Sequence, residues 1–247
     1  MIYLTGDTHG DFGRFSIKRF PQQKDMDRND YVIILGDFGG IFDGSRQEMY
    51  WLDWLSDKPF TVLWIDGNHE NFDILNDLYP EPWNGGRIRR IRPNILHLCR
   101  GQVFRLDEKT FFALGGAQSH DARVLLSQSP SLSQNRRALK RRKVLFRVEG
   151  ESWWRQELPD QHDLRMALDA LAWEDWEVDV VLTHCAPTSL QNRLFPHYPV
   201  NSLTDFLETA RQRLNYGQWF CGHYHQEIQL PDEHFRTLYE SIIPLDD

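Results

Sequence analysis

The sequence predicts an α/β fold in which a parallel sheet is connected by crossover helices. Three apolar runs within residues 1–78, typical of buried strands, alternate with three segments of helical pattern. After residue 94, short apolar runs follow one another too closely for intervening helices, which indicates an antiparallel stretch. Neither a linker nor a fixed-period repeat interrupts the 247 residues, and we expect a single domain over residues 1–247.

The first part of the chain supplies the alternating elements. Uninterrupted apolar runs predict strands at residues 2–4, 31–35 and 60–65. Ser45 suits the N-cap of a helix, and Glu48 stands in the capping-box position three residues later. Further helices are predicted at residues 12–20 and 71–78.

The second part begins with a predicted hairpin and returns to alternation. Residues 107–109 read as the turn between strands 102–106 and 110–114, after a strand at 95–98. Further along, helices are predicted at 164–173 and 201–214 and strands at 178–182 and 218–221, with two short closing strands within 228–243.

Residues 122–146 differ from their surroundings in composition. They begin polar and end with six basic residues among the eight of 136–143. We interpret them as a basic insertion, either a surface loop or a short helix, because long loops of this kind are usually lids, binding loops or disordered segments.

Charge and cysteine content restrict the class of protein. The formal net charge of -8 argues against binding nucleic acid over the whole surface, although it leaves room for a local basic patch. Cys99, Cys185 and Cys221 are far apart and form no CxxC pair, so we expect reduced thiols and a cytoplasmic protein. We find no signal peptide in the N-terminal residues. Apolar runs are also too short for a membrane span, so no membrane association is predicted.

Polar side chains with metal-binding chemistry follow five of the predicted strands. In open α/β sheets, ligands bind at the carboxyl ends of the strands. Mixed carboxylate, amide and imidazole donors suit Mn, Fe, Zn, Co or Ni better than a site for Mg or Ca alone. We therefore predict one metal site where these turns meet: Thr5-Gly6-Asp7-Thr8-His9-Gly10, Gly36-Asp37, Gly67-Asn68-His69-Glu70, Thr183-His184 and Gly222-His223-Tyr224-His225.

Two of these turns carry paired ligands. Asp7 and His9, like His223 and His225, stand two residues apart. On an extended segment such residues point to the same side, so one turn would supply two ligands.

The ordered set resembles the calcineurin-like metallophosphoesterases, and its motifs cover residues 5–225. The resemblance implies a four-layer α/β/β/α sandwich, with two mixed sheets flanked by helices, and two divalent metal ions, Mn being the expected pair. It implies that the first metal is held by Asp7, His9, Asp37 and His225. The second would share Asp37 and be held also by Asn68, His184 and His223.

The resemblance also implies hydrolysis of a phosphomonoester or phosphodiester. Two cations clamp the attacking and leaving oxygens, and a bridging hydroxide attacks in line. His69 would be catalytic, protonating the leaving oxygen or hydrogen-bonding the phosphate. Its usual carboxylate partner in the family's protein-phosphatase branch corresponds here to Gly40, which weakens a protein-phosphatase function and makes Asp43 a candidate replacement.

A narrower resemblance, to a bacterial and prophage-type subgroup, rests on Gly115-Gly116-Ala117-Gln118-Ser119 with Asp121, followed by residues 147–154, from Arg147 to Trp153-Trp154, and by Glu157. It suggests that Arg147 binds the substrate phosphate as a bidentate donor. Asn68 would also lie against the substrate. The two tryptophans are either core residues or a wall of the substrate pocket.

Three functions stay open from sequence. The leading one is the two-metal phosphoesterase, acting on a small molecule or on nucleic acid. A second is a nuclease that attracts nucleic acid through residues 136–143, which are otherwise a solvated charged surface. A third is a non-catalytic module that binds a phosphate ligand, which would require lost metal ligands. Substrate, metal pair and oligomeric state are not determined by these patterns.

Overall fold

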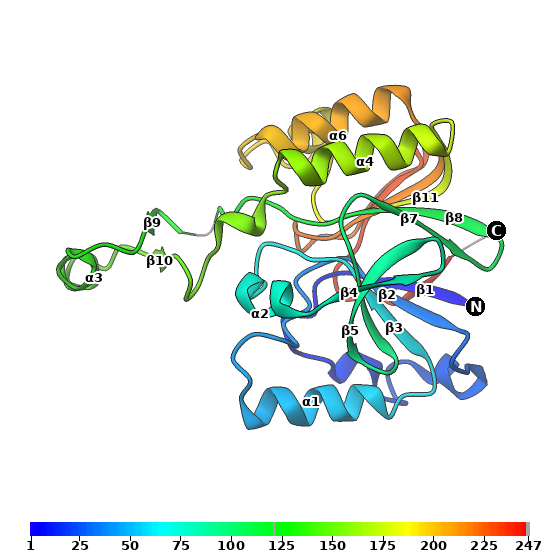
Figure 1. Cartoon of the computed structure of the whole chain (residues 1–247), viewed down its shortest axis with the longest axis horizontal. Coiled ribbons are helices and arrows are strands. Elements are labelled where there is room, and N and C mark those ends of the chain that lie inside the picture. The colour runs from blue at the N-terminus through cyan, green and yellow to red at the C-terminus, as the bar shows by residue number, and fades with distance from the viewer. Residues whose placement is uncertain (121, 246–247) are drawn as a thin grey trace.

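A computed structural model describes residues 1–120 and 122–245. Two sheets face each other, with helices on both outer faces, so the protein has the predicted four-layer α/β/β/α arrangement (Figure 1). Helix α1 (Arg46–Ser56) covers the outer face of the first sheet, and α4 (Gln161–Trp173) and α6 (Ser202–Arg213) cover that of the second.

The first sheet has seven strands in the order β15-β1-β2-β3-β6-β5-β4. Its centre is parallel, from β1 through β2 and β3 to β6, and both edges are antiparallel. The strands are β1 (Ile2–Thr5), β2 (Tyr31–Ile34), β3 (Thr61–Trp64), β4 (Pro80–Trp83), β5 (Gly86–Arg92), β6 (Ile95–Leu98) and β15 (Ile243–Pro244).

The second sheet has six strands in the order β13-β14-β12-β11-β8-β7. Parallel pairing joins β8, β11, β12 and β14, whereas β7 and β8 form the predicted antiparallel hairpin. The strands are β7 (Gln102–Leu106), β8 (Lys109–Leu114), β11 (Glu177–Thr183), β12 (Asn215–Cys221), β13 (Ile228–Leu230) and β14 (Phe235–Thr237).

Three apolar cores match the four layers. Between the sheets, side chains such as Leu4, Phe104 and Leu182 pack together. A second core joins the first sheet to α1 and the 3-10 turns η1 (Gly13–Phe15) and η2 (Pro21–Asp25). The third lies under α4, α6 and the short α5 (Thr188–Leu194).

Several predicted elements need correction. Residues 12–20 do not form the predicted helix, because only η1 is helical there and Phe12, Phe15 and Phe20 are buried from a mostly irregular segment. Ser45 caps α1 as predicted, but Glu48 accepts from the backbone N–H groups of residues 42–44 instead of closing a capping box. Strands β4 and β5 and helix α5 were not predicted from the sequence.

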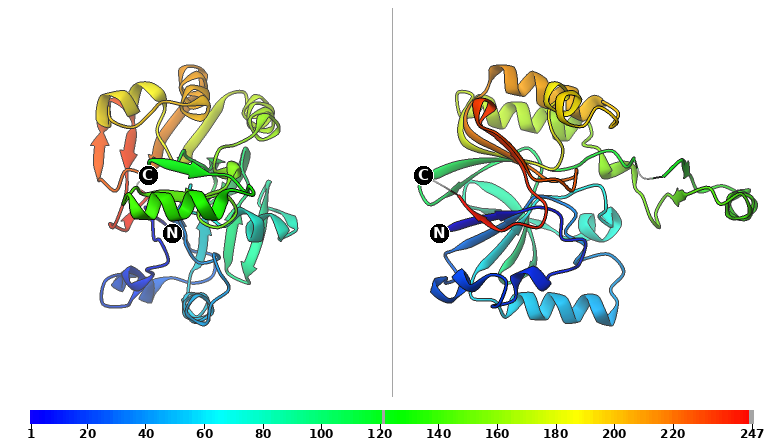
Figure 2. Two further views of the ribbon diagram at one scale, coloured as in Figure 1. Left: turned by 90° about the vertical axis from the view of Figure 1, so that its left-hand side faces the viewer. Right: turned by 180° about the vertical axis from the view of Figure 1, so that it is seen from behind.

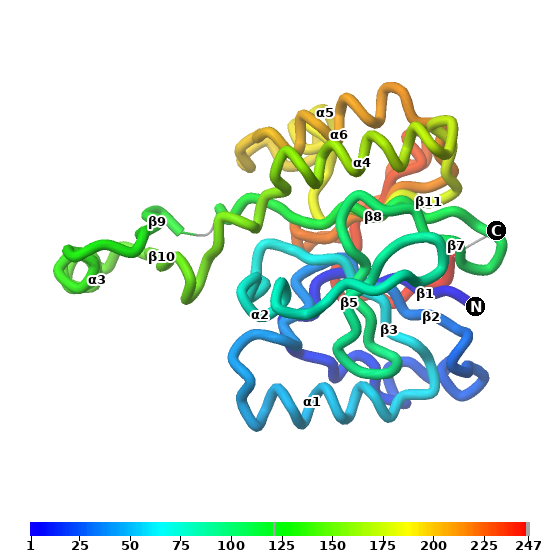
Figure 3. Tube along the Cα trace, viewed as in Figure 1, coloured from blue at the N-terminus to red at the C-terminus, as the bar shows by residue number. Residues whose placement is uncertain are grey.

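Residues 122–146 leave the body as a projecting segment, called the arm below (Figures 1 and 3). The arm contains β9 (Val124–Leu126), α3 (Leu132–Arg141) and the first residue of β10 (Phe146–Val148). Strands β9 and β10 pair in parallel and carry α3 at the far end, as both views of Figure 2 show. The basic insertion is therefore a strand pair with a helix.

Among the described residues, no helix has the length and apolar character of a membrane span.

Candidate metal centre

The predicted ligands come together where strands of both sheets end, and this region is called the corner below. Asp7 and His9 follow β1, Asp37 follows β2 and Asn68 follows β3, all from the first sheet. From the second sheet, His184 follows β11, and His223 and His225 follow β12.

Two overlapping groups in this corner are spaced for metal binding. Asp7, His9 and His225 form one, and Asp7, Asp37 and His184 form the other, with ligand atoms within 4.8 Å of one another in each group. The Nε2 atoms of His9 and His225 are 3.0 Å apart, and Asp7 Oδ2 is 3.0 Å from His225 Nε2. Asp37 faces both groups, with Oδ2 3.8 Å from His9 Nε2 and Oδ1 3.5 Å from His184 Nε2.

The donor atoms fit bound cations. Asn68 Oδ1 and His184 Nε2 are buried and make no hydrogen bond to a described residue, and Asp7 Oδ2 makes none despite its 3.0 Å approach to His225 Nε2. Buried polar atoms are almost always satisfied, and orphaned ones call for an explanation such as an ion. Other buried polar atoms of the described residues, such as Trp64 Nε1 and His97 Nδ1, also lack a partner, but these three belong to predicted ligands in one corner, so a cation that they coordinate accounts for them together.

The buried charges of the corner shift the pKa values of its titrating groups. Burial alone would lower the pKa of His184, but the adjacent Asp37 and Asp7 carboxylates raise it to about 10. Burial alone would raise the pKa of Asp37, but His184 and the other nearby histidines bring it below its usual value. A divalent cation would meet the same field that holds these carboxylates ionised.

A family model described as calcineurin-like phosphoesterase matches residues 1–227. The chain belongs to this family. No curated protein gave a match.

The backbone of this calcineurin-like phosphoesterase is strained at the site. His9, Asp37, His223 and His225 all have positive φ angles, between 47° and 69°. Non-glycine residues adopt this region at a cost and tend to do so at functional sites. The extended geometry predicted for the two i, i+2 pairs is therefore wrong. His225 turns toward His9, whereas the His223 ring lies 5.1 Å from that of His184.

Contacts behind the donor atoms orient them. His184 Nδ1 lies 2.6 Å from the carbonyl oxygen of Leu35, and donation to that oxygen leaves the Nε2 lone pair directed into the corner. The close approach requires Gly36, because a Cβ there would lie 2.1 Å from His184 Nδ1. Asp7 and Asp37 use Oδ1 to accept from the backbone N–H groups of His223 and His69, at 3.0 and 2.8 Å.

Asn68 is positioned by a buried relay that the sequence did not reveal. Asn68 Nδ2 donates to Ser119 Oγ at 3.3 Å, so its Oδ1 atom remains the acceptor available to a metal. Ser119 Oγ in turn donates to Glu157 Oε2 at 2.6 Å, and Ser119 N donates to Glu157 Oε1. All three side chains are buried.

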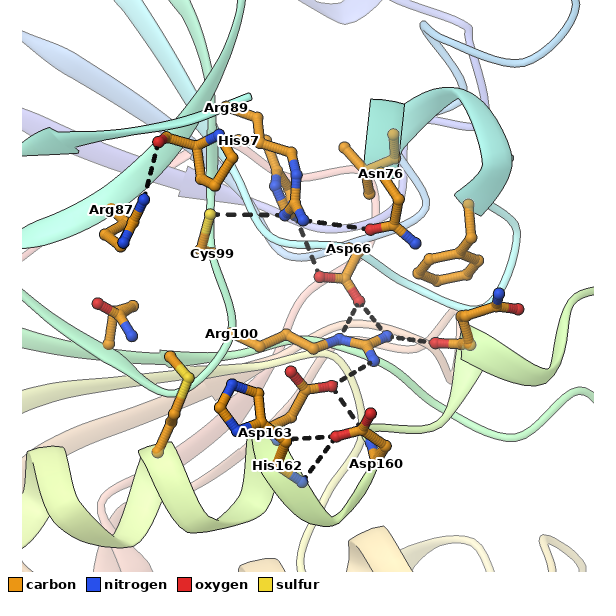
Figure 4. A pocket seen from close by; sticks show the side chains of 16 residues that line it. Asp66, Asn76, Arg87, Arg89, His97, Cys99, Arg100, Asp160, His162 and Asp163 are labelled. Atoms are coloured by element: carbon orange, nitrogen blue, oxygen red, sulfur yellow. Dashed lines mark hydrogen bonds and ion pairs between the residues drawn. The ribbon is translucent and has the colours of Figure 1, made fainter. Parts of the chain in front are cut away.

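Arg100 links the chain segments that carry Asn68 and Glu157. Its guanidinium pairs with buried Asp66, two residues before Asn68, at 2.6 Å, and donates to the carbonyl oxygen of Gln156 at 2.7 Å (Figure 4). These groups line a pocket of about 400 Å³ between α2 (Phe72–Asp77), β5 and α4. Apart from Asp66 and its neighbours, the lining is remote from the predicted ligands.

Glu70 also contributes to the corner, although no role was predicted for it from the sequence. Its Oε1 atom accepts from the backbone N–H groups of Phe38 and Gly67, at 2.9 and 3.3 Å, and so joins the turns after β2 and β3. Burial, reinforced by Asp37, raises the pKa of Glu70 to about 8.

His69 and Arg147 lie together at the edge of the corner. Arg147 Nη2 is 3.5 Å from His69 Nε2, and Arg147 Nη1 donates to the carbonyl oxygen of Ser152. The His69 ring packs edge-on against that of His9, with centroids 5.3 Å apart. Asp121, which belongs to the same sequence pattern as Arg147, lies outside the described residues.

The structure explains why the usual carboxylate position is a glycine. A Cβ on Gly40 would meet the buried Phe38 ring at 2.4 Å, so a longer side chain has no room. The suggested replacement, Asp43, lines the same hollow of about 330 Å³ as His69, but its carboxylate accepts from Ser45 N. Within the described residues, Asp43 makes no hydrogen bond to His69.

The two tryptophans differ in their burial and contacts. Trp154 is 3% exposed, packs edge-on against Phe42 and donates from Nε1 to Asp73. Trp153 donates from Nε1 to the carbonyl oxygen of Leu126 and so fixes the base of the arm. Core packing is thus the correct interpretation of Trp154.

Proposed function

We propose that this protein hydrolyses phosphomonoesters or phosphodiesters at the corner described above, with two divalent metal ions, preferably Mn. The observation that carries the proposal is the set of buried, unsatisfied donor atoms on Asp7, Asn68 and His184. They belong to a carboxylate, amide and imidazole set that suits Mn, Fe, Zn, Co or Ni. Three buried thiols without a disulfide fit action in the cytosol.

The spacing of the donor atoms supports the following division of ligands between two metals. Asp7, His9 and His225 would hold the first metal, with Asp37 reaching both positions through its two oxygens. Asn68, His184 and His223 would complete the second. Bound metals would supply charge neutralisation on the phosphoryl oxygens and an activated water at neutral pH.

His69 would supply the proton for the leaving oxygen. Its backbone N–H is bound to Asp37 and its ring stands beside His9, which holds the imidazole at the rim of the donor set. Arg147 would bind a phosphate oxygen at the same edge, and Asn68 would face the substrate from the inner side. No predicted ligand is missing from the sequence, and five of the seven belong to the two groups spaced for metal binding, which favours an enzyme over a non-catalytic phosphate-binding module.

The test separates catalysis from metal binding. Wild-type protein and His69→Ala are assayed with Mn, Ni, Co, Zn or Mg on p-nitrophenyl phosphate and its bis ester, while bound metal is measured. We expect His69→Ala to keep its metal and to lose about 10²–10⁴-fold in turnover. His162→Ala, an exposed histidine outside the corner, is the matched control. Near-normal turnover by His69→Ala would rule out its assigned role, and inactivity of metal-loaded wild type on all esters would rule out the function.

A further inference from the structure

The arm begins and ends beside the proposed active site. Strand β10 carries Arg147, whose guanidinium lies 3.5 Å from His69, and the arm extends outward from there with α3 at its far end (Figures 1 and 2). Phe146 and Val148 pair with Val124 and Leu126, so the stalk is a two-stranded ladder. A ligand held by α3 and the end of the stalk would therefore lie on a line that leads to His69.

Charge separates the arm from the rest of the molecule. Residues 122–146 contain seven of the 28 Lys and Arg residues and none of the 36 Asp and Glu residues. The remainder of the chain is consequently more acidic than the net charge of -8 suggests. A polyanion would be repelled by the body and attracted by the arm, which directs its binding to one place.

Most cations of the arm form no ion pair with an acidic side chain in the described part of the chain. Helix α3 has no buried residue, and Arg136 pairs with Glu151. Arg137, Lys140, Arg141 and Lys143 make no ion pair with any described residue. Like charges four residues apart, such as Arg137 and Arg141, destabilise an isolated helix. An anionic ligand on this surface would remove that repulsion.

We propose that the arm binds the sugar–phosphate backbone of a nucleic acid strand and presents one of its phosphodiesters to the corner. This proposal rests on the proposed function and names its substrate class. Phe146 is the only aromatic residue of the arm, so recognition is through phosphates and is independent of base sequence. The alternative partner for the arm is the acidic body of a second copy of the chain. However, the run of cations from α3 to Arg147 ends at a phosphoesterase site, which favours a strand of phosphates.

Binding is measured by fluorescence anisotropy with labelled 20-nucleotide oligothymidine and oligouridine, on metal-loaded protein, with gels to confirm an intact probe. The test variant carries Arg137→Gln, Lys140→Gln, Arg141→Gln and Lys143→Gln. The matched control removes two Lys and two Arg from the exposed body surface through Lys18→Gln, Arg19→Gln, Lys24→Gln and Arg165→Gln.

We expect wild-type binding to weaken about 50-fold between 50 and 200 mM salt if four phosphates are contacted. The arm variant should bind at least about 10-fold more weakly than wild type with a shallower salt dependence, and the body control within about twofold. Equal loss in both variants, or no binding by wild type at low salt, would overturn the proposal. So would a salt-sensitive dimer, seen by sedimentation, that depends on the arm while nucleic acid does not bind. Turnover of the bis ester by wild type tests the proposed function separately.

Discussion

The metal corner and the arm differ in what holds them in place. In the corner, donor atoms are fixed by groups far away in sequence: Asp7 by the backbone of His223, and His184 by the carbonyl oxygen of Leu35. The arm is held by contacts that span shorter stretches of the chain, since Trp153 bonds to Leu126, 27 residues away, and Arg136 pairs with Glu151, 15 residues away. The corner therefore depends on the whole sandwich, whereas the arm can change without disturbing it.

The largest effect is expected at the point shared by both halves of the corner. Asp37→Asn keeps the shape of a fully buried side chain but removes the charge that faces His9 and His184. We expect turnover to fall about 10³-fold or more, since metal ions contribute several kcal/mol to the transition state. Metal analysis and kcat/KM measure the two consequences.

Asp43→Asn is the control for Asp37→Asn. Asp43 lines the neighbouring hollow but accepts its hydrogen bond from Ser45 N. If the Asp37 variant retained both metals and normal turnover while the fold was unchanged, Asp37 would not bridge the corner and the assignment of both metal positions would be wrong.

A smaller effect is expected from the relay behind Asn68. Glu157→Gln and Ser119→Ala each break the contacts that turn Asn68 Oδ1 toward the corner, without removing a ligand. Loss of such partners typically lowers metal affinity 10–100-fold. We expect one metal position to weaken while the other keeps its affinity, as titration with Mn would show. Glu151→Gln, which removes the ion-pair partner of Arg136 in the arm, should leave both positions unchanged; equal weakening by Glu151→Gln would argue against a specific relay.

The strand-end ligands were predictable because each follows an apolar run and stands beside a glycine or threonine that marks the turn. The relay was not predicted, although Ser119 and Glu157 belong to the narrower sequence pattern. Ser119 is 51 residues from Asn68 and 38 from Glu157, and nothing in that pattern shows that their side chains touch. The helix predicted at residues 12–20 failed although its phenylalanines have helical spacing. Gly13 disfavours a helix, and its N–H is taken by the Asp11 side chain.

Strand β5 forms although its sequence lacks the pattern that predicts a strand. Its sequence is Gly-Arg-Ile-Arg-Arg-Ile-Arg, with exposed arginines and few apolar residues, so it lacks the pattern of a buried strand. Its place between β4 and β6 comes from pairing with neighbours. Elements that depend on tertiary contacts were missed, whereas those that bury their own apolar run were found.

The smallest effect is expected from shortening the arm. Replacing residues 125–145 by Gly-Gly removes α3, which has no buried residue, and leaves Trp154 and the three apolar cores intact. Surface changes of this kind shift stability by about 0.5 kcal/mol, which is about 1–2 °C in Tm for a chain of this size. Leu207→Ala, which truncates a fully buried side chain on the inner face of α6, should instead lower the free energy of unfolding by about 2–5 kcal/mol. Thermal unfolding of both variants beside wild type makes the comparison. A loss for the shortened protein as large as that of Leu207→Ala would show that the arm supports the sandwich, and the contrast between the two regions would fail.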